Sequence, residues 1–229
     1  MANYVMVVDL HDCTGCGACM IACKNENNVQ EGTFWCSNEK EITGEFPNIE
    51  YSYKPTFCNH CDNAPCVEAC PVDPKAIFKD SESNLVLMDA DRCIGCRNCE
   101  NECPYGVISY NAEEAHPFWR DEKGQEMVED VGGNVIPYYN PNRARTWDGI
   151  RREEVVEKCT FCDHRLAEGL NPYCVESCPA QALNFGDLDD TSSEVYQLLE
   201  EYEATRLKED QGTEPNVYYI REFSKLEKQ

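Results

Sequence analysis

The sequence predicts an α+β fold in which short strands and helical turns surround repeated groups of cysteines. Short apolar runs with strand character flank these groups, as in Tyr4–Leu10, and a helical pattern begins near residue 191. The chain also contains 17 cysteines in 229 residues, and sixteen of them fall into four groups with related spacing. This internal repetition organises the chain.

Each cysteine group opens with C-x-x-C and closes with C-x-x-x-C. The four quartets are Cys13, Cys16, Cys19, Cys23; Cys58, Cys61, Cys66, Cys70; Cys93, Cys96, Cys99, Cys103; and Cys159, Cys162, Cys174, Cys178. The first and third have the form C-x₂-C-x₂-C-x₃-C, whereas the second and fourth have longer loops between their second and third cysteines. Proline follows the last three quartets and Lys24 follows the first. Cys36 stands outside the quartets and is expected to be a free thiol.

This spacing favours iron–sulfur clusters over disulfides or zinc. An odd number of cysteines and the absence of an expected secretory signal argue against a disulfide framework. Structural zinc usually binds two separated C-x-x-C knuckles, whereas the compact four-cysteine run followed by proline is the ligand pattern of bacterial [4Fe–4S] ferredoxins. In that pattern three cysteines bind one cluster and the fourth binds another. Four complete quartets therefore predict four [4Fe–4S] clusters, and we expect the chain to be unstable without them.

The elements around the quartets are expected in a regular order. Tyr4–Leu10 predicts a strand that leads into the first quartet and Leu85–Ala90 one that leads into the third, with Asp9 and Asp89 near their ends. Gly106–Tyr110 predicts a returning strand. Between the third and fourth cysteines of a quartet there is room only for a short helical turn. The repeated strand–loop–helix–strand unit is that of a ferredoxin.

The later parts of the chain have a different character. Residues 112–152 form a long acidic insertion, for which a docking loop and a solvated excursion both remain open. Thr191 and Glu194 have the spacing of a capping box. The apolar stripe after them predicts a helix packed on the chain's own core or on a partner; it consists of Val195, Leu198, Leu199 and Tyr202. Asn216–Phe223 predicts a terminal extended segment.

Composition excludes several classes of function. The net charge is −23, from 43 Asp and Glu against 20 Lys and Arg, and no dense basic segment is present, so nucleic acid and anionic lipid are poor partners. No apolar run is long enough to predict a membrane span, and the first residues do not predict a secretory signal. There is also no nucleophile elbow, P-loop or dinucleotide fingerprint, and we expect no catalytic residue in this chain.

Several polar residues lie near quartets and are candidates for tuning cluster potentials. Imidazole hydrogen bonds to sulfur or local positive charge would raise a potential, while ordinary packing and ion pairing are the alternatives. The candidates are His11, His60, His164, Lys24, Arg92, Arg97, Lys158 and Arg165; the remaining histidine, His116, is not among them.

With these motifs in this order, the chain resembles the iron–sulfur electron-transfer subunits of DMSO reductase-family molybdenum oxidoreductases. The segments that carry the resemblance are CNHCDNAPCVEACP (58–71), DRCIGCRNCENECPYGV (91–107) and EKCTFCDHRLAEGLNPYCVESCP (157–179). The segments MVVDLHDCTGCGAC, FGDLDD and NVYYIREF are most similar to the small subunit of respiratory arsenate reductases.

The resemblance implies two ferredoxin-like lobes related by a pseudo-twofold axis. One lobe would comprise residues 1–50 and 153–190, the other residues 51–111, with an insertion or docking loop at 112–152 and a C-terminal helix with a partner-docking tail at 191–229. The implied ligand sets are Cys13, Cys16, Cys19, Cys178 (cluster 1); Cys58, Cys61, Cys66, Cys103 (cluster 2); Cys93, Cys96, Cys99, Cys70 (cluster 3); and Cys159, Cys162, Cys174, Cys23 (cluster 4).

The resemblance also implies a function: single electrons pass between a donor and a large molybdopterin (Mo-bisPGD) catalytic subunit. The donor would be a quinone-linked membrane subunit or a soluble carrier, with cluster 1 facing the catalytic subunit. A location outside the cytoplasmic membrane, reached by export with a twin-arginine partner, and a cytoplasmic location are both compatible with the sequence. The alternatives are a subunit of a phenolic-ring dehydroxylase or transhydroxylase, or of a DMSO- or polysulfide-type reductase, and a free-standing polyferredoxin or a zinc-stabilised interaction module.

Overall fold

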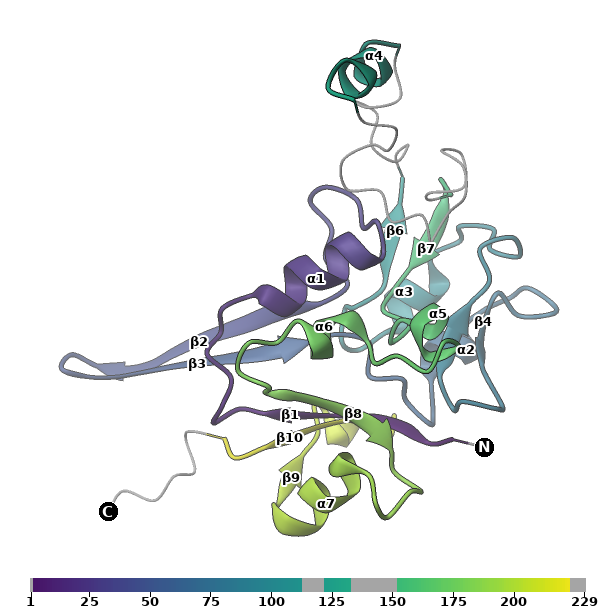
Figure 1. The fold of residues 1–229 in the computed structure, drawn as a ribbon. Helices are drawn as coiled ribbons and strands as arrows, with labels where there is room; N and C mark the ends of the chain where they lie inside the picture. Colours follow the sequence, from purple (N-terminus) through teal and green to yellow (C-terminus); the bar gives the residue numbers. More distant parts are fainter. Residues whose placement is uncertain (1, 113–121, 133–151, 223–229) are drawn as a thin grey trace.

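A four-stranded sheet with the order β8-β1-β10-β9 holds the N-terminal strand in its interior (Figure 1). The computed structural model describes residues 2–112, 122–132 and 152–222. In this sheet β1 runs antiparallel to β8 and parallel to β10, and β9 pairs with the other edge of β10. The strands are β1 (Tyr4–Asp9), β8 (Leu183–Asp187), β9 (Ala204–Thr205) and β10 (Val217–Ile220).

Strand β1 is buried on both faces, which explains its nearly continuous apolar sequence. Met6 and Val8 belong to a core that also contains quartet cysteines, whereas Val5 and Val7 belong to a separate core under α7 (Glu194–Glu201). The sheet therefore separates the cysteine-containing core from an ordinary apolar core.

Helix α7 packs on the chain's own sheet through the apolar stripe that its sequence predicts. Val195 is fully buried, and Leu198, Leu199 and Tyr202 pack against the same core. The predicted capping box at Thr191 is wrong. Ser193 caps the helix, because its hydroxyl accepts the backbone N–H of Tyr196 while the preceding residues form a turn around Asp190.

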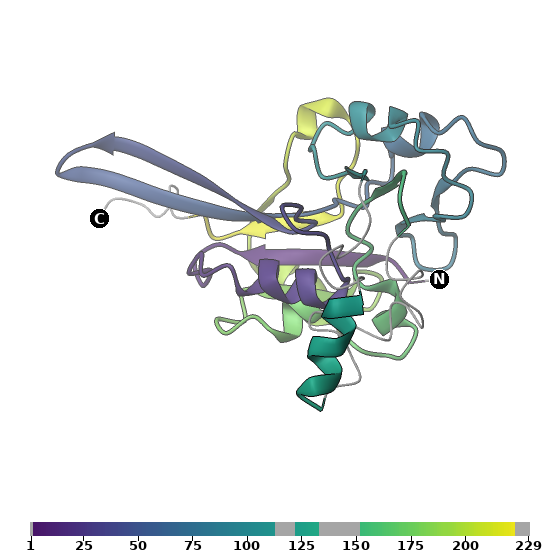
Figure 2. The same ribbon diagram turned by 90° about the horizontal axis from the view of Figure 1, so that it is seen from above.

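A long two-stranded hairpin, absent from the elements expected on sequence, extends well beyond the body of the protein (Figures 1 and 2). It consists of β2 (Ser37–Glu45) and β3 (Asn48–Thr56), paired antiparallel from Ser37↔Thr56 to Glu45↔Asn48. The hairpin connects the first quartet to the second.

Two short ribbons support the second and third quartets. Strand β4 (Ile77–Lys79) pairs with β5 (Val86–Met88), and β6 (Ser109–Asn111) pairs with β7 (Val155–Glu157). The predicted strand at Leu85–Ala90 corresponds to β5 and that at Gly106–Tyr110 to β6, each shorter than expected. Because β7 precedes the fourth quartet, the second ribbon links segments on the two sides of the insertion.

A helix lies at the third-to-fourth cysteine step of every quartet, as the spacing predicts; these helices are α1 (Ala18–Glu26), α2 (Pro65–Glu68), α3 (Asn98–Glu102) and α6 (Tyr173–Glu176). Helix α1 is longer than a single turn, because it continues past Cys23. Helix α5 (Asp163–Leu166) was not expected, because it lies between the second and third cysteines of the fourth quartet. Together with the sheets these helices confirm the α+β prediction.

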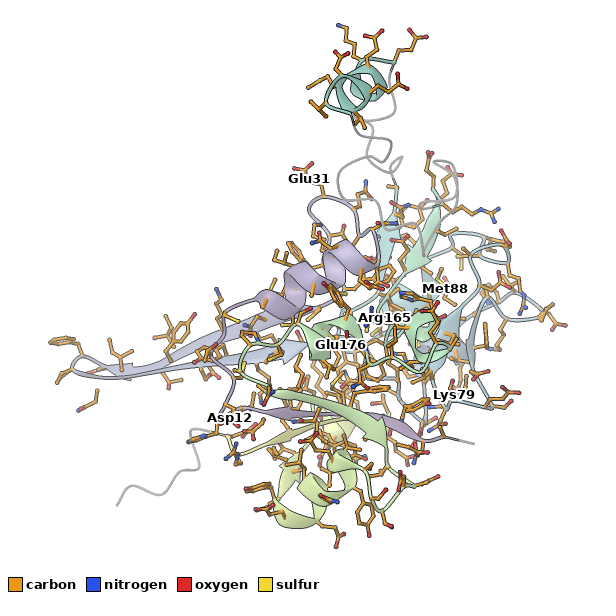
Figure 3. All side chains as sticks on the ribbon, in the orientation of Figure 1. Asp12, Glu31, Lys79, Met88, Arg165 and Glu176 are labelled. Atoms are coloured by element: carbon orange, nitrogen blue, oxygen red, sulfur yellow. The ribbon has the colours of Figure 1, made fainter. Side chains whose placement is uncertain are left out.

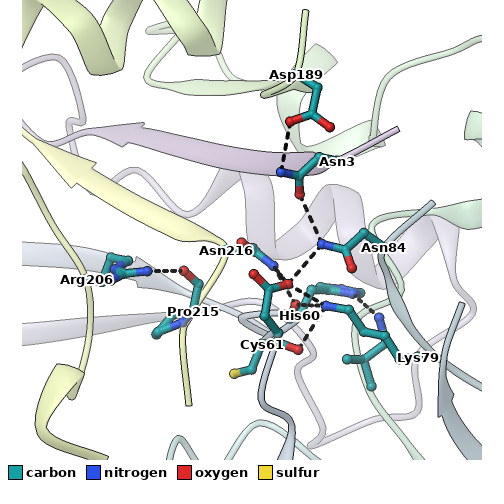
Figure 4. Close-up of polar contacts among 11 residues, drawn as sticks. Asn3, His60, Cys61, Lys79, Asn84, Asp189, Arg206, Pro215 and Asn216 are labelled. Atoms are coloured by element: carbon teal, nitrogen blue, oxygen red, sulfur yellow. Dashed lines mark hydrogen bonds and ion pairs between the residues drawn. The ribbon is translucent and has the colours of Figure 1, made fainter. Parts of the chain in front are cut away.

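The segment between β9 and β10, which includes a 3₁₀ turn at Glu209–Gln211, crosses to the second quartet. Asn216 donates to the backbone oxygen of His60 at 2.9 Å and to Asp62 at 2.8 Å, and Lys79 donates to His60, Cys61 and Asp62 (Figure 4). These hydrogen bonds tie the loop of the second quartet to both β4 and the C-terminal segment. Burial works against the charge of Asp62, but hydrogen bonds from Lys79, Asn216 and other donors lower the pKa of its carboxyl.

Of the predicted insertion at 112–152, the structure describes residues 112, 152 and 122–132, which contain α4 (Glu122–Asp130); the rest, including His116, lies outside the described residues. Among the described residues, no helix has both the length and the apolar composition that a membrane crossing needs.

Candidate metal centres

Three hollows are each lined by four quartet cysteines. They have nearly equal size, with about 340, 320 and 310 Å³ of space, part of which is open to solvent. Each combines the first three cysteines of one quartet with the last cysteine of another. The three sets are Cys13, Cys16, Cys19, Cys178; Cys58, Cys61, Cys66, Cys103; and Cys93, Cys96, Cys99, Cys70.

The four remaining quartet cysteines, Cys23, Cys159, Cys162 and Cys174, are all buried. Their electrostatic interactions place them together: burial raises the pKa of Cys159 and of Cys174, and repulsion from Cys23 adds to the rise at both thiols. In addition, the side-chain amide of Asn27 lies 3.7 Å from the sulfur of Cys23 and 3.8 Å from that of Cys162. This set also combines three cysteines of one quartet with the last of another.

Asp9, at the end of β1, stabilises the turn that leads into the loop of the first site. Its carboxylate accepts the backbone N–H groups of His11 and Asp12, and Arg221 forms an ion pair with it. Asp9 also accepts the N–H of Cys13 through its backbone oxygen at 3.1 Å. The turn thus directs the chain from the sheet into the cysteine loop.

The loop of the third site repeats this turn with a different supporting contact. Asp89 accepts the backbone N–H groups of Asp91 and Arg92 and pairs with the side chain of Arg92 at 2.8 Å. Gly95 in this loop has φ +67° and lies against the backbone just before β7. A Cβ at this position would lie 2.2 Å from the backbone oxygen of Glu154. Only glycine fits this position.

The buried thiols are suited to a multinuclear cation centre. Burial raises the pKa of Cys61 and of Cys99 to about 11 and that of Cys66 to about 12. Such thiols become thiolates only where nearby cations supply compensating charge, as iron does. Within the described ranges, no three His, Cys, Asp or Glu side chains converge on a point that would hold a single ion. Thiols spread around a hollow fit a cubane better than one zinc ion.

Hydrogen-bond donors surround several of the sulfurs. The backbone N–H groups of Phe161 and Ala182 point at Cys159 and Cys178, at 3.4 and 3.3 Å. The hydroxyl of Thr213, on the C-terminal segment, forms a hydrogen bond with Cys61 that partly opposes the effect of burial on its pKa. Neither Asn27 nor Thr213 is among the residues expected from sequence. Asn27 could have been suggested by its place four residues after Cys23, on the same helix face.

Cys36, the cysteine outside the quartets, is only 2% exposed and lies beside the first and fourth sets. Its thiol forms a hydrogen bond with Cys19, which lowers the pKa of Cys19 to about 7. The same bond, with burial, raises the pKa of Cys36 well above its usual value. Cys36 therefore stays protonated as a donor to a quartet sulfur.

Most of the charged candidates form ion pairs. Arg92 pairs with Asp89, and Arg97 pairs with Glu100 at 2.6 Å. Arg165 pairs with Glu176 at 2.6 Å, and Figure 3 shows these two side chains near each other. These three cations are held in carboxylate contacts on the surface or at its margin. Their contribution to a cluster is correspondingly screened.

The two lysines bind backbone carbonyl groups. Lys24 donates to Thr33 at 2.9 Å and to Gln30, and its ammonium also lies over the ring of Phe34. Lys158, only 2% exposed, donates to the backbone oxygens of Cys159 and Val86 between the second and fourth sets. Its charge is therefore close to two centres and sheltered from water.

Two of the histidines near quartets have clear packing partners. The ring of His60 is fully buried, stacks on Phe161 at 4.0 Å and accepts the N–H of Val86; burial lowers its pKa well below the usual value. His164 lies 2.7 Å from Glu26. His11 is near Asp12 at 3.3 Å.

The comparisons with known proteins agree with this chemistry. Two families, both described as 4Fe-4S dicluster domains, match the chain: one at residues 5–76, the other at residues 49–118 and again at 120–188. These matches imply four [4Fe–4S] clusters.

Several relatives that match nearly all of this chain are named as components of reductases. The chain is 46% identical to the arsenate respiratory reductase iron–sulfur subunit of Shewanella sp. (strain ANA-3), over 95% of this chain and 96% of the relative. It is 36% identical to a subunit of selenate reductase from Mesobacillus selenatarsenatis, over 95% and 72% of the two chains. It is 34% identical to the iron–sulfur cluster-binding subunit of menaquinone reductase from Nitratidesulfovibrio vulgaris, over 94% and 87%.

Proposed function

The chain belongs to the family of iron–sulfur electron-transfer subunits of molybdopterin oxidoreductases, and from this premise we propose that it serves a respiratory arsenate reductase. The near full-length similarity to an arsenate respiratory reductase subunit supports this choice. The partner would be a molybdopterin catalytic subunit, and a quinone-linked membrane subunit or a soluble carrier would exchange electrons at the other end.

We assign the sixteen quartet cysteines to four iron-binding sets in which fourth ligands are exchanged between the first and fourth quartets and between the second and third. The three four-cysteine hollows and the buried group around Asn27 support this assignment. The ligand sets are those implied by the family resemblance: Cys13, Cys16, Cys19, Cys178 (cluster 1); Cys58, Cys61, Cys66, Cys103 (cluster 2); Cys93, Cys96, Cys99, Cys70 (cluster 3); and Cys159, Cys162, Cys174, Cys23 (cluster 4).

The four sites form a series in the order 1, 4, 2, 3. Cys174 of site 4 interacts electrostatically with Cys19 of site 1, and Cys159 of site 4 interacts with Cys58 of site 2. Sites 2 and 3 share one apolar core that contains both Cys66 and Cys99. When bound, each cluster takes up and gives up one electron, while the protein sets ligation, spacing and potential.

The observation that carries the proposal is the exposure of the two ends of this series. Among the sixteen quartet cysteines only Cys16 of site 1 and Cys96 of site 3 are exposed. The cysteines of site 4 are all buried, and in site 2 only Cys103 is partly exposed, so electrons would enter and leave at opposite ends of the series. A donor at site 3 and the catalytic subunit at site 1 fit this arrangement.

The test is metal analysis and electron transfer in the anaerobically purified complex. We expect about 16 Fe per copy of this chain, in addition to iron in the partner, and molybdenum in a large co-purifying subunit. Reduced clusters should be oxidised rapidly by arsenate. Selenate and dimethyl sulfoxide serve as comparison acceptors, and oxidation by either in place of arsenate would change the assigned substrate.

A variant of one exposed cysteine tests whether electrons enter the series at site 3. Cys96→Ser should abolish reduction through site 3 but leave arsenate reduction by a dye that reduces the catalytic subunit directly. Iron without molybdenum or a large partner would favour a free polyferredoxin, and zinc in place of iron would exclude electron transfer.

A further inference from the structure

In its outer half, the β2–β3 hairpin has one apolar face and one polar face. Directly opposed residues in an antiparallel pair share a face, and the register pairs Ile42 with Tyr51 and Gly44 with Ile49. These three large side chains are exposed by 68%, 48% and 54% for Ile42, Tyr51 and Ile49. The intervening positions, which point to the other face, include the exposed Glu39, Glu41, Thr43, Glu45 and Ser52.

The same face continues toward the first metal site, where it also carries the exposed Lys40, opposite Tyr53. Pro55, next but one after Tyr53 on the same face, lines the hollow of site 1 with its partner Asn38. The ring of Tyr53 packs closely on the first cysteine loop, since a Cβ added to Gly15 would lie 2.6 Å from that ring. The ring centroids of Tyr53 and Tyr51 are 5.6 Å apart. The apolar face therefore leads outward from the exposed end of the electron-transfer series.

The outer half of such a hairpin would gain stability from a partner. Two strands alone are marginally stable in water, and both faces of the outer half are exposed. Nine residues in each strand span about 30 Å. A surface of this length suits a permanent interface, which is larger and more apolar than that of a transient electron carrier.

We propose that the apolar face of the β2–β3 hairpin is the arm by which this chain binds its molybdopterin catalytic subunit, holding that subunit against site 1. The inference rests on the proposed function, because the redox partner at the Cys16 end is taken to be the catalytic subunit. The acidic face remains in water, and the arm fixes the position of the partner relative to the exposed end of the series.

The test compares two double alanine variants of the co-expressed complex. Ile42→Ala with Tyr51→Ala removes two opposed side chains from the apolar face. Thr43→Ala with Ser52→Ala replaces one residue of each strand on the polar face, at the positions next to that pair. The first variant should bind the catalytic subunit at least about 30-fold more weakly, as loss of central apolar anchors does, and the second should bind like the wild type.

Iron content and the electron paramagnetic resonance spectrum of the isolated variants report whether they fold. Both should match the wild type, because these side chains lie outside the metal sites. In the wild-type complex, amide hydrogen exchange across residues 37–56 should slow relative to the free chain.

The outcomes separate this inference from the proposed function. If the wild type assembles with the catalytic subunit but the apolar-face variant binds equally well, the hairpin inference is wrong and the proposed function stands. If the wild type does not assemble with such a subunit, the proposed function is wrong. If sedimentation shows that the apolar face instead joins two copies of this chain, the inference is overturned.

Discussion

The two halves of the molecule hold the same ligands in different scaffolds. The sheet region, made of β1, β8, β9, β10 and α7, contains an apolar core without any cysteine, built on Val5, Val7, Val195 and Ile220. The ribbon region, made of β4 to β7 with α2 and α3, has a core that includes Cys61, Cys66 and Cys99 among its buried residues. One half can bury apolar surface without metal, whereas the other depends on its thiols to complete its interior.

This difference shows that repeated ligand motifs do not require repeated scaffolds. The cysteine loops are similar because the cofactor demands similar geometry. The surrounding elements differ because the two halves bury their remaining apolar surface differently. The first half packs a helix on a sheet, and the second packs its apolar side chains around the metal sites.

The largest expected effect follows from iron removal. Anaerobic chelation should abolish protection from amide hydrogen exchange in β4 to β7, because the ribbon core loses its centre. Strands β1 and β10 should keep measurable protection, since they also pack against α7. Equal loss in both regions would contradict the comparison.

The second prediction compares the two aspartate turns. Asp9 is paired with Arg221, and the side chain of Asp9 is only 6% exposed; Asp89 and Arg92 are 29% and 42% exposed. Arg221→Ala leaves a buried carboxylate and should destabilise the fold by about 2–3 kcal/mol, whereas Arg92→Ala should cost at most about 1 kcal/mol.

Thermal denaturation of the iron-loaded protein, followed by loss of its visible absorbance, measures both variants. The midpoint should fall by about 5–10 °C for Arg221→Ala and by less than about 4 °C for Arg92→Ala. Equal midpoints would show that the two turns are supported alike.

The third prediction concerns Asn27, whose amide approaches two sulfurs of the fourth set. A donor to sulfur stabilises the reduced, more negative cluster, so Asn27→Leu should lower one midpoint potential by a few tens of millivolts. Potentiometric titration monitored by electron paramagnetic resonance measures this shift. Asn101→Leu, an exposed change in the ribbon region, is the control and should leave all four potentials in place.

The smallest expected effect is at Cys36. Cys36→Ala removes the weak S–H donor to Cys19 and should lower a single potential by less than Asn27→Leu does. Cys36→Ser keeps a donor and should restore the potential of the wild type. If serine and alanine give the same shift, the effect arises from packing rather than from the hydrogen bond.

Much of the metal chemistry could be predicted from local sequence. The three closely spaced cysteines of each strict quartet can wrap only a nearby centre, so their role follows from spacing alone. The positions of β1 and β10 were also predictable, because their apolar runs are long enough to indicate strands. The start of α7 was misplaced, since Thr191 and Ser193 both have capping side chains and only the turn around Asp190 selects between them.

The residues alone determined the cofactor, the sixteen candidate ligands and the α+β class, because these depend on side-chain chemistry and short-range spacing. Folding in three dimensions decided what lies far apart along the chain: Cys178 beside Cys13, Thr213 beside Cys61, and β10 between β1 and β9. The amphipathic hairpin belongs to the same category. The alternation of apolar and polar residues does not by itself say which face of the hairpin leads to the first metal site. The contact between Tyr53 and the loop of Gly15 identifies that face.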